Sequence, residues 1–372
     1  MTRRMKGKVA TRPLDPTHTK TRIVDPAGGT GIDTDIQAAI DNLGGNGGVV
    51  YVEQGTYTIT SPISIPSYVS LIGRGNVTIQ IDSNSNVSAL KNSNPTDGND
   101  RIAVLGFHIK SRNTGQQDYA LLDFAKVRHS LFEDLMIDGQ QLKRAGISLG
   151  KESQGNRVMN CTVTYCDTGI ALMPAGAALG PSKNFIEACR VCQCHVGIYL
   201  WRSHHNVVRG NVCQNIVATG SNIVGHDGIL AEESCHNVFQ GNVCEYACEH
   251  GIYVSGTTDG ESWDNALTGN VCYHNSRCGI HLCGNSKHSV QKNAAVGNTC
   301  CSNQDGIVLD NYAKRNTLTG NACTNNSRYG IWEVLTGTQK NIILGNICTN
   351  NTSKGIKKGN AKSGTLINHN QE

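Results

Sequence analysis

The 372-residue sequence has few charged and few aromatic residues. Charged side chains make up 17% of the chain and aromatic side chains 5%, whereas glycine contributes 42 residues. This composition is typical of many short strands joined by tight turns, and it disfavours a protein of long helices. The formal net charge of +4 is too small to predict nucleic-acid binding across the whole surface. No stretch is apolar enough to cross a bilayer, so the sequence predicts no membrane segment.

The most basic segment is the N-terminal leader, residues 1–22. It opens with MTRRMKGKVATR and has no apolar run behind its basic residues, so it does not resemble a secretory signal peptide. Two interpretations stay open: a flexible, solvated tail, or an arm that docks onto the other proteins of a virion. Both are compatible with synthesis in the cytosol, while the final location stays open.

Cysteine is absent before Cys161, and most of the 16 cysteines keep step with an internal repeat. The repeat has the pattern N-x-x-x-G-N-x-C, and its starts lie 23 to 31 residues apart, at Asn206, Asn237, Asn265, Asn293, Asn316 and Asn341. A constant core at a varying spacing predicts a rigid structural rung that carries a loop of variable length.

A second signal accompanies each repeat: a Gly-Ile pair followed by a mostly apolar residue. It begins at Gly146, Gly169, Gly197, Gly228, Gly251, Gly279 and Gly306, with weaker copies at Gly330 and Gly355. Each unit therefore holds three short extended pieces, which bury an apolar face when they coil and stack into parallel sheets. The sequence predicts an all-β fold, a parallel β-helix of about eleven or twelve rungs that starts near Asn76.

Alternation along the strands places the second Asn and the Cys of each repeat inside the coil. The expected ladders are Asn211, Asn242, Asn270, Asn298, Asn321 and Asn346, and Cys213, Cys244, Cys272, Cys300, Cys323 and Cys348. A buried amide both donates and accepts, so stacked Asn side chains can bond from rung to rung. The cysteines are interpreted as reduced, structural thiols. The segment CRVCQC, from Cys189 to Cys194, has no second ligand pair at metal-binding spacing and is interpreted in the same way.

The exposed edge of the first rung needs a cover, and residues 33–43 are expected to supply it as a short helix. Asp33 or Thr34 is the expected N-cap, and the helix ends before a Gly-Gly pair. Ile36, Ile40 and Leu43 share the face that would pack on the rung.

The run DPAGGTGIDTDIQAAIDNLGGNGGVVYVEQGTYTIT, with PISIPSYVSLIGRG and the Asn-containing rungs, resembles the pectate-lyase-like β-helix superfamily. This superfamily includes pectate lyases, polygalacturonases, mannuronate epimerases and viral tailspikes. The resemblance implies a right-handed coil over residues 23–372 as one domain. It also implies carbohydrate chemistry on the face of the Gly-Ile strands.

With each Ile pointing inward, the Gly-Ile strands present a strip of outward rings: Tyr199, Trp201, Tyr253, His281 and Trp332. Flat rings with polar edges suit the faces of sugars. The candidate substrate-binding residues are Tyr199, Trp201, Tyr253 and Arg277. The longest loops, residues 214–227 and 255–265, flank this strip.

Asp227 and His250 precede the strand at equivalent places on adjacent rungs. A carboxylate beside an imidazole can orient the ring and raise its pKa, so this pair is the first catalytic candidate, against a role in shaping the loops. His281 and Glu232 are further candidates for acid–base chemistry. Glu232 and Asp310 lie three rungs apart, about 14 Å, which is too far for the two carboxylates of a glycosidase.

Motifs that would fix the reaction are missing from the sequence. GHDG at Gly225 lacks the Gly-His-Gly spacing and the paired aspartates of polygalacturonases, and no Asp-Pro-His motif of mannuronate epimerases is present. No acidic cluster of the calcium type is apparent on neighbouring rungs, so the sequence predicts no metal site and no cofactor, with calcium left open.

The sequence therefore predicts a protein that binds a polysaccharide, and three enzymatic activities stay open: lyase, epimerase and glycoside hydrolase. The alternative is a non-catalytic adhesive or structural part of a virion or surface assembly, similar to a tailspike. Partners expected beside the glycan are further copies of the chain, such as a trimer, or virion proteins.

Overall fold

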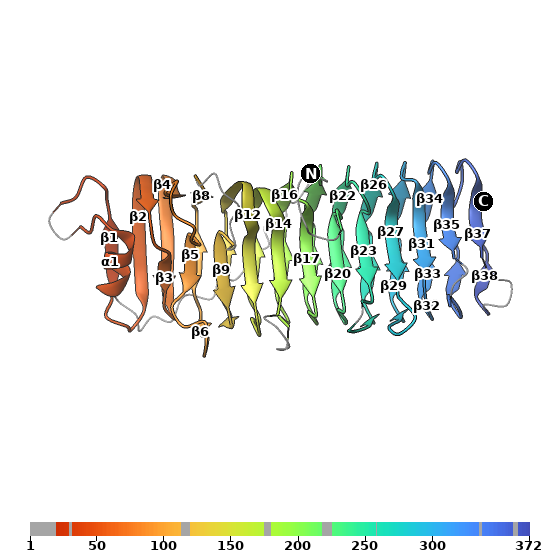
Figure 1. Ribbon diagram of the computed structural model, residues 1–372, viewed down its shortest axis with the longest axis horizontal. Helices are drawn as coiled ribbons and strands as arrows, with labels where there is room; N and C mark the ends of the chain where they lie inside the picture. Colours follow the sequence, from red (N-terminus) through yellow and green to blue (C-terminus); the bar gives the residue numbers. More distant parts are fainter. Residues whose placement is uncertain are drawn as a thin grey trace, which may run out of the picture.

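The computed structural model describes residues 20–29, 32–112, 120–174, 180–217, 225–257, 259–334, 337–359 and 364–372, without the side chains of residues 141–144. Most of the predicted leader, residues 1–19, lies outside these ranges, and the first strand begins at Thr21. The described chain is an elongated all-β parallel solenoid of about 12 turns, as predicted. Its strands lie side by side along the long axis, from β1 at one end to β38 at the other (Figure 1).

The middle of the solenoid repeats three strands a turn. The first set contains the Gly-Ile pairs and comprises β14 (Thr162–Met173), β17 (Val196–Trp201), β20 (Ile229–Glu232), β23 (Ile252–Ser255), β27 (Cys278–Cys283), β31 (Asp305–Asp310), β35 (Tyr329–Glu333) and β37 (Lys354–Lys358). The second comprises β13 (Arg157–Met159), β15 (Phe185–Glu187), β18 (Val207–Arg209), β21 (Val238–Gln240), β25 (Ala266–Thr268), β29 (Ala294–Val296), β33 (Thr317–Thr319), β36 (Ile342–Leu344) and β38 (Leu366–Asn368). The third comprises β16 (Arg190–Cys192), β19 (Val212–Gln214), β22 (Val243–Glu245), β26 (Val271–Tyr273), β30 (Thr299–Cys301) and β34 (Ala322–Thr324).

The N-terminal turns have longer strands and fewer repeats of the motif. They comprise β1 (Thr21–Val24), β2 (Gly48–Ile59), β3 (Ile63–Ile65), β4 (Val69–Ile81), β5 (Leu90–Asn92), β7 (Ala103–Leu105), β8 (His108–Lys110), β9 (Leu122–Ala125), β11 (Leu131–Glu133) and β12 (Met136–Gly150). Short flanking strands are β6 (Asn99–Asp100), β10 (Val127–Arg128), β24 (Ser262–Trp263), β28 (Val290–Gln291) and β32 (Ala313–Lys314). Each named strand pairs in parallel with its counterpart one turn away, as β2 does with β4.

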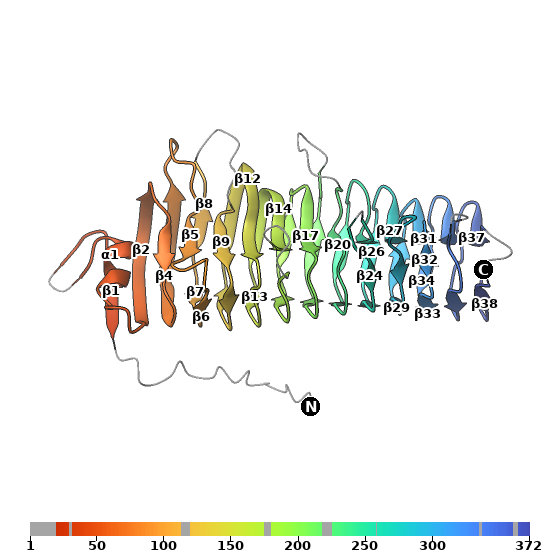
Figure 2. The ribbon, with the colours of Figure 1, turned by 60° about the horizontal axis from the view of Figure 1, so that its bottom comes forward.

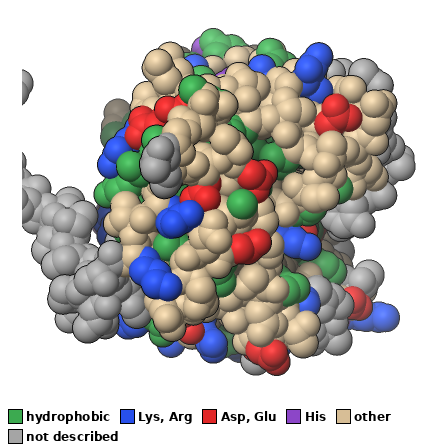
Figure 3. Space-filling view, turned by 90° about the vertical axis from the view of Figure 1, so that its left-hand side faces the viewer, with side chains coloured by type: hydrophobic (Ala, Val, Ile, Leu, Met, Phe, Trp, Pro, Cys, Tyr) green, Lys and Arg blue, Asp and Glu red, His purple; other side chains and the backbone are tan. Residues whose placement is uncertain are grey.

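Helix α1 (Ile36–Asp41) covers the first turn, as predicted, with Ile36, Ile40 and Leu43 buried. The expected N-cap was wrong by one or two residues: Asp35 caps the helix by accepting a 2.8 Å hydrogen bond from the backbone N–H of Ala38. Asp33 instead forms an ion pair with Arg22 at 2.8 Å, which ties the start of the helix to β1. Figure 2 shows α1 at the N-terminal end of the solenoid, beside β1. Figure 3 shows acidic and basic side chains mixed across this end of the molecule.

The predicted Asn ladder is present and is one of three. Asn242 shows its pattern: its backbone N–H and its side-chain Nδ2 both donate to Asn270 Oδ1 at 3.0 Å, and Nδ2 also donates to the carbonyl of Val208 at 2.9 Å. A second ladder runs through the first Asn of each repeat, as between Asn237 and Asn265. A third runs through Asn275, Asn303, Asn326 and Asn351, three residues after each Cys.

The ladders lie at the corners of the coil because the residue before each ladder Asn has a left-handed backbone. His236 precedes Asn237 with φ 58°, and Gly241 precedes Asn242 with φ 62°. Such a residue turns the chain sharply between two strands and leaves backbone groups without sheet partners. The side-chain amide of the following Asn supplies those partners, which explains why Gly and Asn recur together.

The Cys ladder is also present. Cys244 lies opposite Cys272 in the register of β22 and β26, and Cys272 lies opposite Cys300 in the next pair of strands. The six predicted cysteines are at most 1% exposed, and all sixteen cysteines of the chain are free thiols. Cys189 and Cys194 are buried as well, in keeping with their structural interpretation. Among the described residues, no helix is long and apolar enough to cross a bilayer.

Candidate functional site

A shallow depression of about 320 Å³ lies on the face of the Gly-Ile strands. Its walls are Met173, Tyr199, Trp201, Glu232, Glu233, Thr257 and Asp259. Trp201 lies opposite Glu232 in the register of β17 and β20, so the indole and the carboxyl group project side by side. Both rings predicted to bind substrate on β17 are half-buried, which leaves part of each open to a ligand.

Tyr199 and Glu232 form the polar centre of the depression. The Tyr199 hydroxyl donates a hydrogen bond to Glu232 Oε2. Burial raises the pKa of Glu232, the hydrogen bond from Tyr199 opposes this shift, and the nearby Glu233 adds to it. Burial and the Glu232 carboxylate raise the pKa of Tyr199 as well. The pair can therefore hold a proton at higher pH than an exposed carboxyl group can.

Arg202 fixes the rim of the depression. Its Nε lies 2.5 Å from Glu233 Oε2, and its NH2 group lies 2.8 Å from Asp259 Oδ2. The guanidinium also lies 5.0 Å from the centre of the Trp201 ring. The side chain of Asp259 is 65% exposed, so its carboxylate is accessible to a ligand.

A second cluster of rings lies next to the depression, on β23 and β27. The rings of Tyr253 and His281 stack with centroids 4.9 Å apart and 11° between their planes. His250 lies 4.6 Å from the His281 ring and is 5% exposed. The half-buried Tyr253 and His281 therefore extend the aromatic strip that the sequence predicted, while His250 lies beneath it.

Asp227 and His250 occupy equivalent places on adjacent rungs, but the hydrogen bond between them involves the backbone of His250 and not its ring. Asp227 is fully buried, and its Oδ1 accepts a hydrogen bond from the backbone N–H of His250 at 2.9 Å rather than from the imidazole. Burial raises the pKa of Asp227 to about 8. Burial, with His281 and Arg277 nearby, lowers the pKa of His250 to about 2, so the expected rise was wrong. Both groups are neutral near pH 7 and lie below the surface.

The hydrogen bonds of His250 fix its proton. Its Nδ1 accepts from the backbone N–H of Cys278 at 3.2 Å, so a neutral imidazole carries its proton on Nε2. That nitrogen lies 3.2 Å from His281 Nδ1. His281 Nε2 faces Asp310 Oδ2 at 3.8 Å. Burial lowers the pKa of His281, but the contacts with Asp310 and Cys283 outweigh it and raise this pKa to about 9.

Two overlapping groups of metal-ligating side chains meet at His281. One contains His250, Cys278 and His281, and the other contains His281, Cys283 and Asp310; in each, the donor atoms lie within 4.8 Å of one another. This cluster was not among the candidates drawn from the sequence, which predicted no metal site. Its signal is H-x-C in GIHLC, which puts two donors on one face of a strand, beside Asp310 on the next rung.

The remaining candidates lie apart from the depression. Arg277 forms an ion pair with Glu249 at 3.3 Å and is more than half exposed. Trp332 lies under Arg328, 4.4 Å from the ring centre, at the far end of the strip. Glu232 and Asp310 are separated by Ser255 and Cys283 in the strand register, so three strand spacings, about 14 Å, divide them as expected. Residues 218–224 of the first predicted flanking loop lie outside the described ranges.

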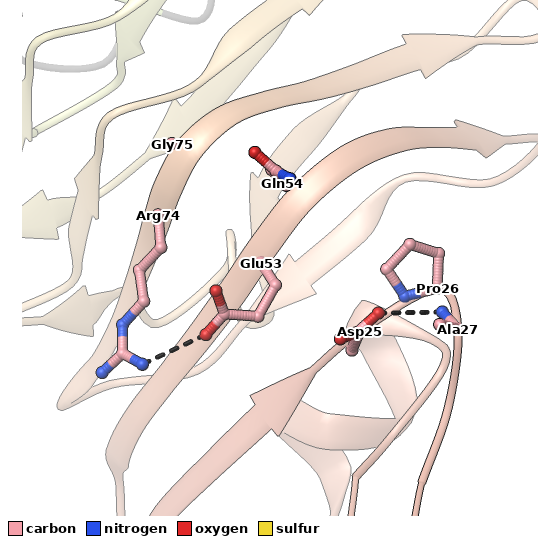
Figure 4. Close-up of a pocket in the computed structure, with 7 residues that line it drawn as sticks. All are labelled: Asp25, Pro26, Ala27, Glu53, Gln54, Arg74 and Gly75. Carbon is pink, nitrogen blue, oxygen red and sulfur yellow. Dashed lines mark hydrogen bonds and ion pairs between the residues drawn. The ribbon is translucent and has the colours of Figure 1, made fainter.

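A larger depression of about 660 Å³ lies at the N-terminal end, lined by Asp25, Pro26, Ala27, Glu53, Gln54, Arg74 and Gly75 (Figure 4). Its Glu53 and Arg74 pair with each other at 3.1 Å, and Arg74 also covers the ring of Tyr51 at 3.6 Å. Asp25 Oδ1 accepts from the backbone N–H of Ala27. The depression on the Gly-Ile face is the better candidate site, because the half-buried rings of Tyr199 and Trp201 line it beside a carboxyl group.

Several solved structures share this fold. The A-module of mannuronan C-5 epimerase AlgE4 from Azotobacter vinelandii is 13% identical, with a TM-score of 0.72 over 90% of this chain and 94% of its own. The catalytic unit of an α-1,3-glucanase from Streptomyces thermodiastaticus is 15% identical, with a TM-score of 0.59 over 90% and 65%. Tailspike protein 3 of bacteriophage CBA120 is 15% identical, with a TM-score of 0.55 over 90% and 59%. At these identities the similarity establishes the fold.

Sequence families divide the chain into two matched regions. No protein with a curated description matches it by sequence. Residues 20–118 match the family described as rhamnogalacturonase A/epimerase, pectate lyase-like, which confirms the resemblance inferred from the first turns. Residues 108–289 and 256–371 match the family described as periplasmic copper-binding protein (NosD). Because these two segments together span most of the solenoid and well over half of the sequence, the chain belongs to the NosD family of parallel β-helix proteins.

Proposed function

We propose that this protein binds a polysaccharide along the Gly-Ile strands and cleaves it at the depression formed by Tyr199, Trp201 and Glu232. The observation that carries the proposal is the half-buried Trp201 beside a carboxyl group whose pKa is raised. An indole face beside a carboxyl group with a raised pKa supplies a stacking surface for a sugar ring and a proton donor for a leaving oxygen. The epimerase and glucanase named above, which share the fold, support this class of ligand.

The binding surface extends along several turns. Trp201 and Tyr199 lie on β17, Tyr253 lies two strands away on β23, and His281 lies on β27. At about 4.8 Å between neighbouring strands, three spacings cover about 14 Å. The rings therefore line a path along the solenoid axis, which suits an extended chain of sugars better than a single small sugar.

The charges around the depression favour a neutral glycan. Glu233 and Asp259 are negative, and Arg202 supplies one positive charge between them. The remaining net negative charge would repel the carboxylates of a polyuronate. This preference differs from the mannuronan in the name of the epimerase with the same fold, and it favours hydrolysis over β-elimination.

Hydrolysis requires a proton donor and a second carboxylate near the scissile bond. Glu232 is the proton donor in this proposal, because its raised pKa keeps the carboxyl group protonated when others have ionised. Asp259 is the second carboxylate, since it lines the same depression and is exposed. Asp310 is too distant for that role, and Asp227 is buried.

The test is a panel of neutral and acidic polysaccharides, read both for reducing ends and for unsaturated products. The proposal expects reducing ends from a neutral glycan, loss of their release in Glu232→Gln, and weaker binding in Trp201→Ala. Glu245→Gln on β22, outside the depression, is the matched control. Unsaturated products from a polyuronate would overturn the choice of reaction. Binding without release of any product would replace the enzymatic role with an adhesive one.

A second candidate function is metal-ion binding, because the family description names copper. Nitrogen and sulfur donors suit copper, and the group His250, Cys278 and His281 offers two imidazoles and one thiol. The residues present thus fit such an ion chemically. His250 and Cys278 are buried, and His281 belongs to the half-buried aromatic strip, so copper bound there would lie at the edge of the glycan surface. Equilibrium dialysis of the whole chain against copper, followed by measurement of bound metal, tests this function.

A further inference from the structure

We infer that His281, Cys283 and Asp310 form a metal site of the zinc type, outside the depression lined by Tyr199, Trp201 and Glu232 and at the His281 end of the aromatic strip. His281 and Cys283 lie two residues apart on β27 and project from the same face. Asp310 lies opposite Cys283 in the register of β27 and β31, one strand spacing away. The parallel register therefore brings an imidazole, a thiol and a carboxylate together without any long loop.

The donor atoms lie close enough for one ion to gather them. All three lie within 4.8 Å of one another, and His281 Nε2 lies 3.8 Å from Asp310 Oδ2. That separation is too long for a hydrogen bond, and among the described residues His281 Nε2 is buried with no hydrogen-bond partner. The nitrogen is within ion-pair range of Asp310 but too far away to donate a hydrogen bond to it, so a cation between the two groups would contact both.

The choice of ion follows from the donors. Nitrogen, thiolate and carboxylate are the three ligand types that Zn²⁺ takes in proteins, whereas Ca²⁺ and Mg²⁺ take oxygen. A carboxylate is a poor ligand for Cu⁺, which prefers sulfur and nitrogen. Three protein ligands leave the fourth tetrahedral position open. The side chains of His281 and Asp310 are 13% and 24% exposed, so solvent reaches this side of the cluster.

Neighbouring groups already orient the ligands. His250 Nε2 lies 3.2 Å from His281 Nδ1, and Asn311 Nδ2 donates to Cys283 Sγ at 3.7 Å, as it would to a thiolate. Cys283 Sγ also lies 3.5 Å from the carbonyl of Gly284, its acceptor as a thiol. Contacts of this kind hold metal ligands in place and tune their basicity.

Ion binding requires His281 Nε2 and Cys283 Sγ without their protons, because a neutral imidazole nitrogen and a thiolate are the forms that coordinate Zn²⁺. His281 Nδ1, which lies 3.2 Å from His250 Nε2, then carries the proton of the ring. The backbone N–H of Cys278 donates to His250 Nδ1 at 3.2 Å, so this amide is placed to report the event.

The test uses the full chain, stripped of metal and dialysed against Zn²⁺ or Cu⁺, with bound metal measured per chain. The proposal expects one Zn²⁺ per chain, an affinity at least about 100-fold weaker in Cys283→Ser and Asp310→Asn, and a shifted Cys278 amide resonance on binding. Cys301→Ser, a half-buried cysteine outside the cluster, is the matched control and should bind normally. Thermal unfolding of the metal-free variants shows that each remains folded.

The absence of stoichiometric Zn²⁺ binding would overturn the proposal, and so would an unchanged affinity in Cys283→Ser. Two further results would overturn it by assigning the ion to the buried group with His250. They are binding that is abolished by Cys278→Ser but kept in Cys283→Ser, and a preference for Cu⁺ over Zn²⁺. These measurements detect bound metal and not glycan cleavage. A negative result would therefore not contradict the glycan proposal, and a protein that cleaves no glycan could still bind the metal.

Discussion

The phenol of Tyr199 donates a hydrogen bond to the carboxyl group of Glu232 on the adjacent strand. A donor to the ionised carboxylate favours ionisation, so this bond lowers the pKa of Glu232 against the rise caused by burial. The pKa of Glu232 is thus set by two opposing effects, burial and the hydrogen bond from Tyr199. Replacing Tyr199 with Phe removes the hydrogen bond and keeps an aromatic ring in the depression.

Tyr199→Phe should shift the basic limb of the pH–activity profile to higher pH. Without the hydroxyl, ionised Glu232 loses a stabilising partner, its pKa rises further, and the protonated acid persists to higher pH. A charge-assisted hydrogen bond of this kind corresponds to about one pH unit. Cleavage rates measured across pH, with the exposed Tyr246→Phe as control, test it. A limb that stays in place or moves to lower pH would show that Glu232 is not the titrating acid.

Replacing Asn270 with Leu should destabilise the fold by several kcal/mol. The substitution removes the acceptor of two bonds from Asn242 and the donor of bonds to Asn298 and to the Phe239 carbonyl. Each buried polar group left unpaired costs about 1–3 kcal/mol. Denaturant unfolding gives the free energy directly, and the exposed Gln240→Leu on β21 is the control. An unchanged midpoint would mean that water replaces the ladder bonds.

The cysteine ladder should be unreactive in the native protein. Cys213, Cys244, Cys272, Cys300 and Cys323 are fully buried, so a thiol reagent reaches them after unfolding. The exposed Cys248 should react quickly, and Cys248→Ser should remove that fast phase. Labelled sites are identified by mass spectrometry with and without denaturant. Rapid modification of any ladder cysteine in the folded chain would contradict its burial.

Asp227→Asn should flatten the dependence of stability on pH. The pKa of Asp227 is raised from 3.8 to about 8 in the folded state, so between these values the native state holds a proton that the unfolded state releases. Stability therefore falls as pH rises through this window in the wild type. The Asn side chain keeps an oxygen for the His250 N–H and does not ionise.

Urea unfolding at pH 5 and pH 8 measures this difference, which should amount to a few kcal/mol in the wild type and shrink in the variant. The exposed Asp97→Asn should behave as the wild type does. Equal pH dependence in wild type and Asp227→Asn would show that this carboxyl group is not buried in its protonated form.

The fold was predictable because its signals are periodic. Alternation along a strand decides which side chains enter the core, and the repeat brought Asn270 and Cys272 to the right faces. The third ladder was missed because its Asn lies beyond the repeat core, after a residue such as His274 with a left-handed backbone. The spacing of residues in the sequence does not show that the chain turns at such a residue, so it does not place the following Asn inside the coil.

The site was less predictable, because alternation does not describe what covers a strand. Leu230 occupies an outward position in β20 and is nevertheless 1% exposed. Asp227 precedes that strand at a bend, where the alternating rule does not apply, and its carboxyl group lies inside. Tyr199 meets Glu232, and Cys283 meets Asp310, because of the register between neighbouring strands. The repeat spacing predicts which strands are neighbours, but it does not predict which side chains touch.

The ladder hydrogen bonds join each turn to its immediate neighbours, which makes the solenoid behave as a one-dimensional lattice. An interior turn is held on two sides and a terminal turn on one, so opening begins at the ends and advances inward. The strands β17 to β31 occupy the interior of the described stack (Figure 1). Amide hydrogens there should exchange last, and the glycan surface and the metal cluster would keep their geometry while the outer turns fray.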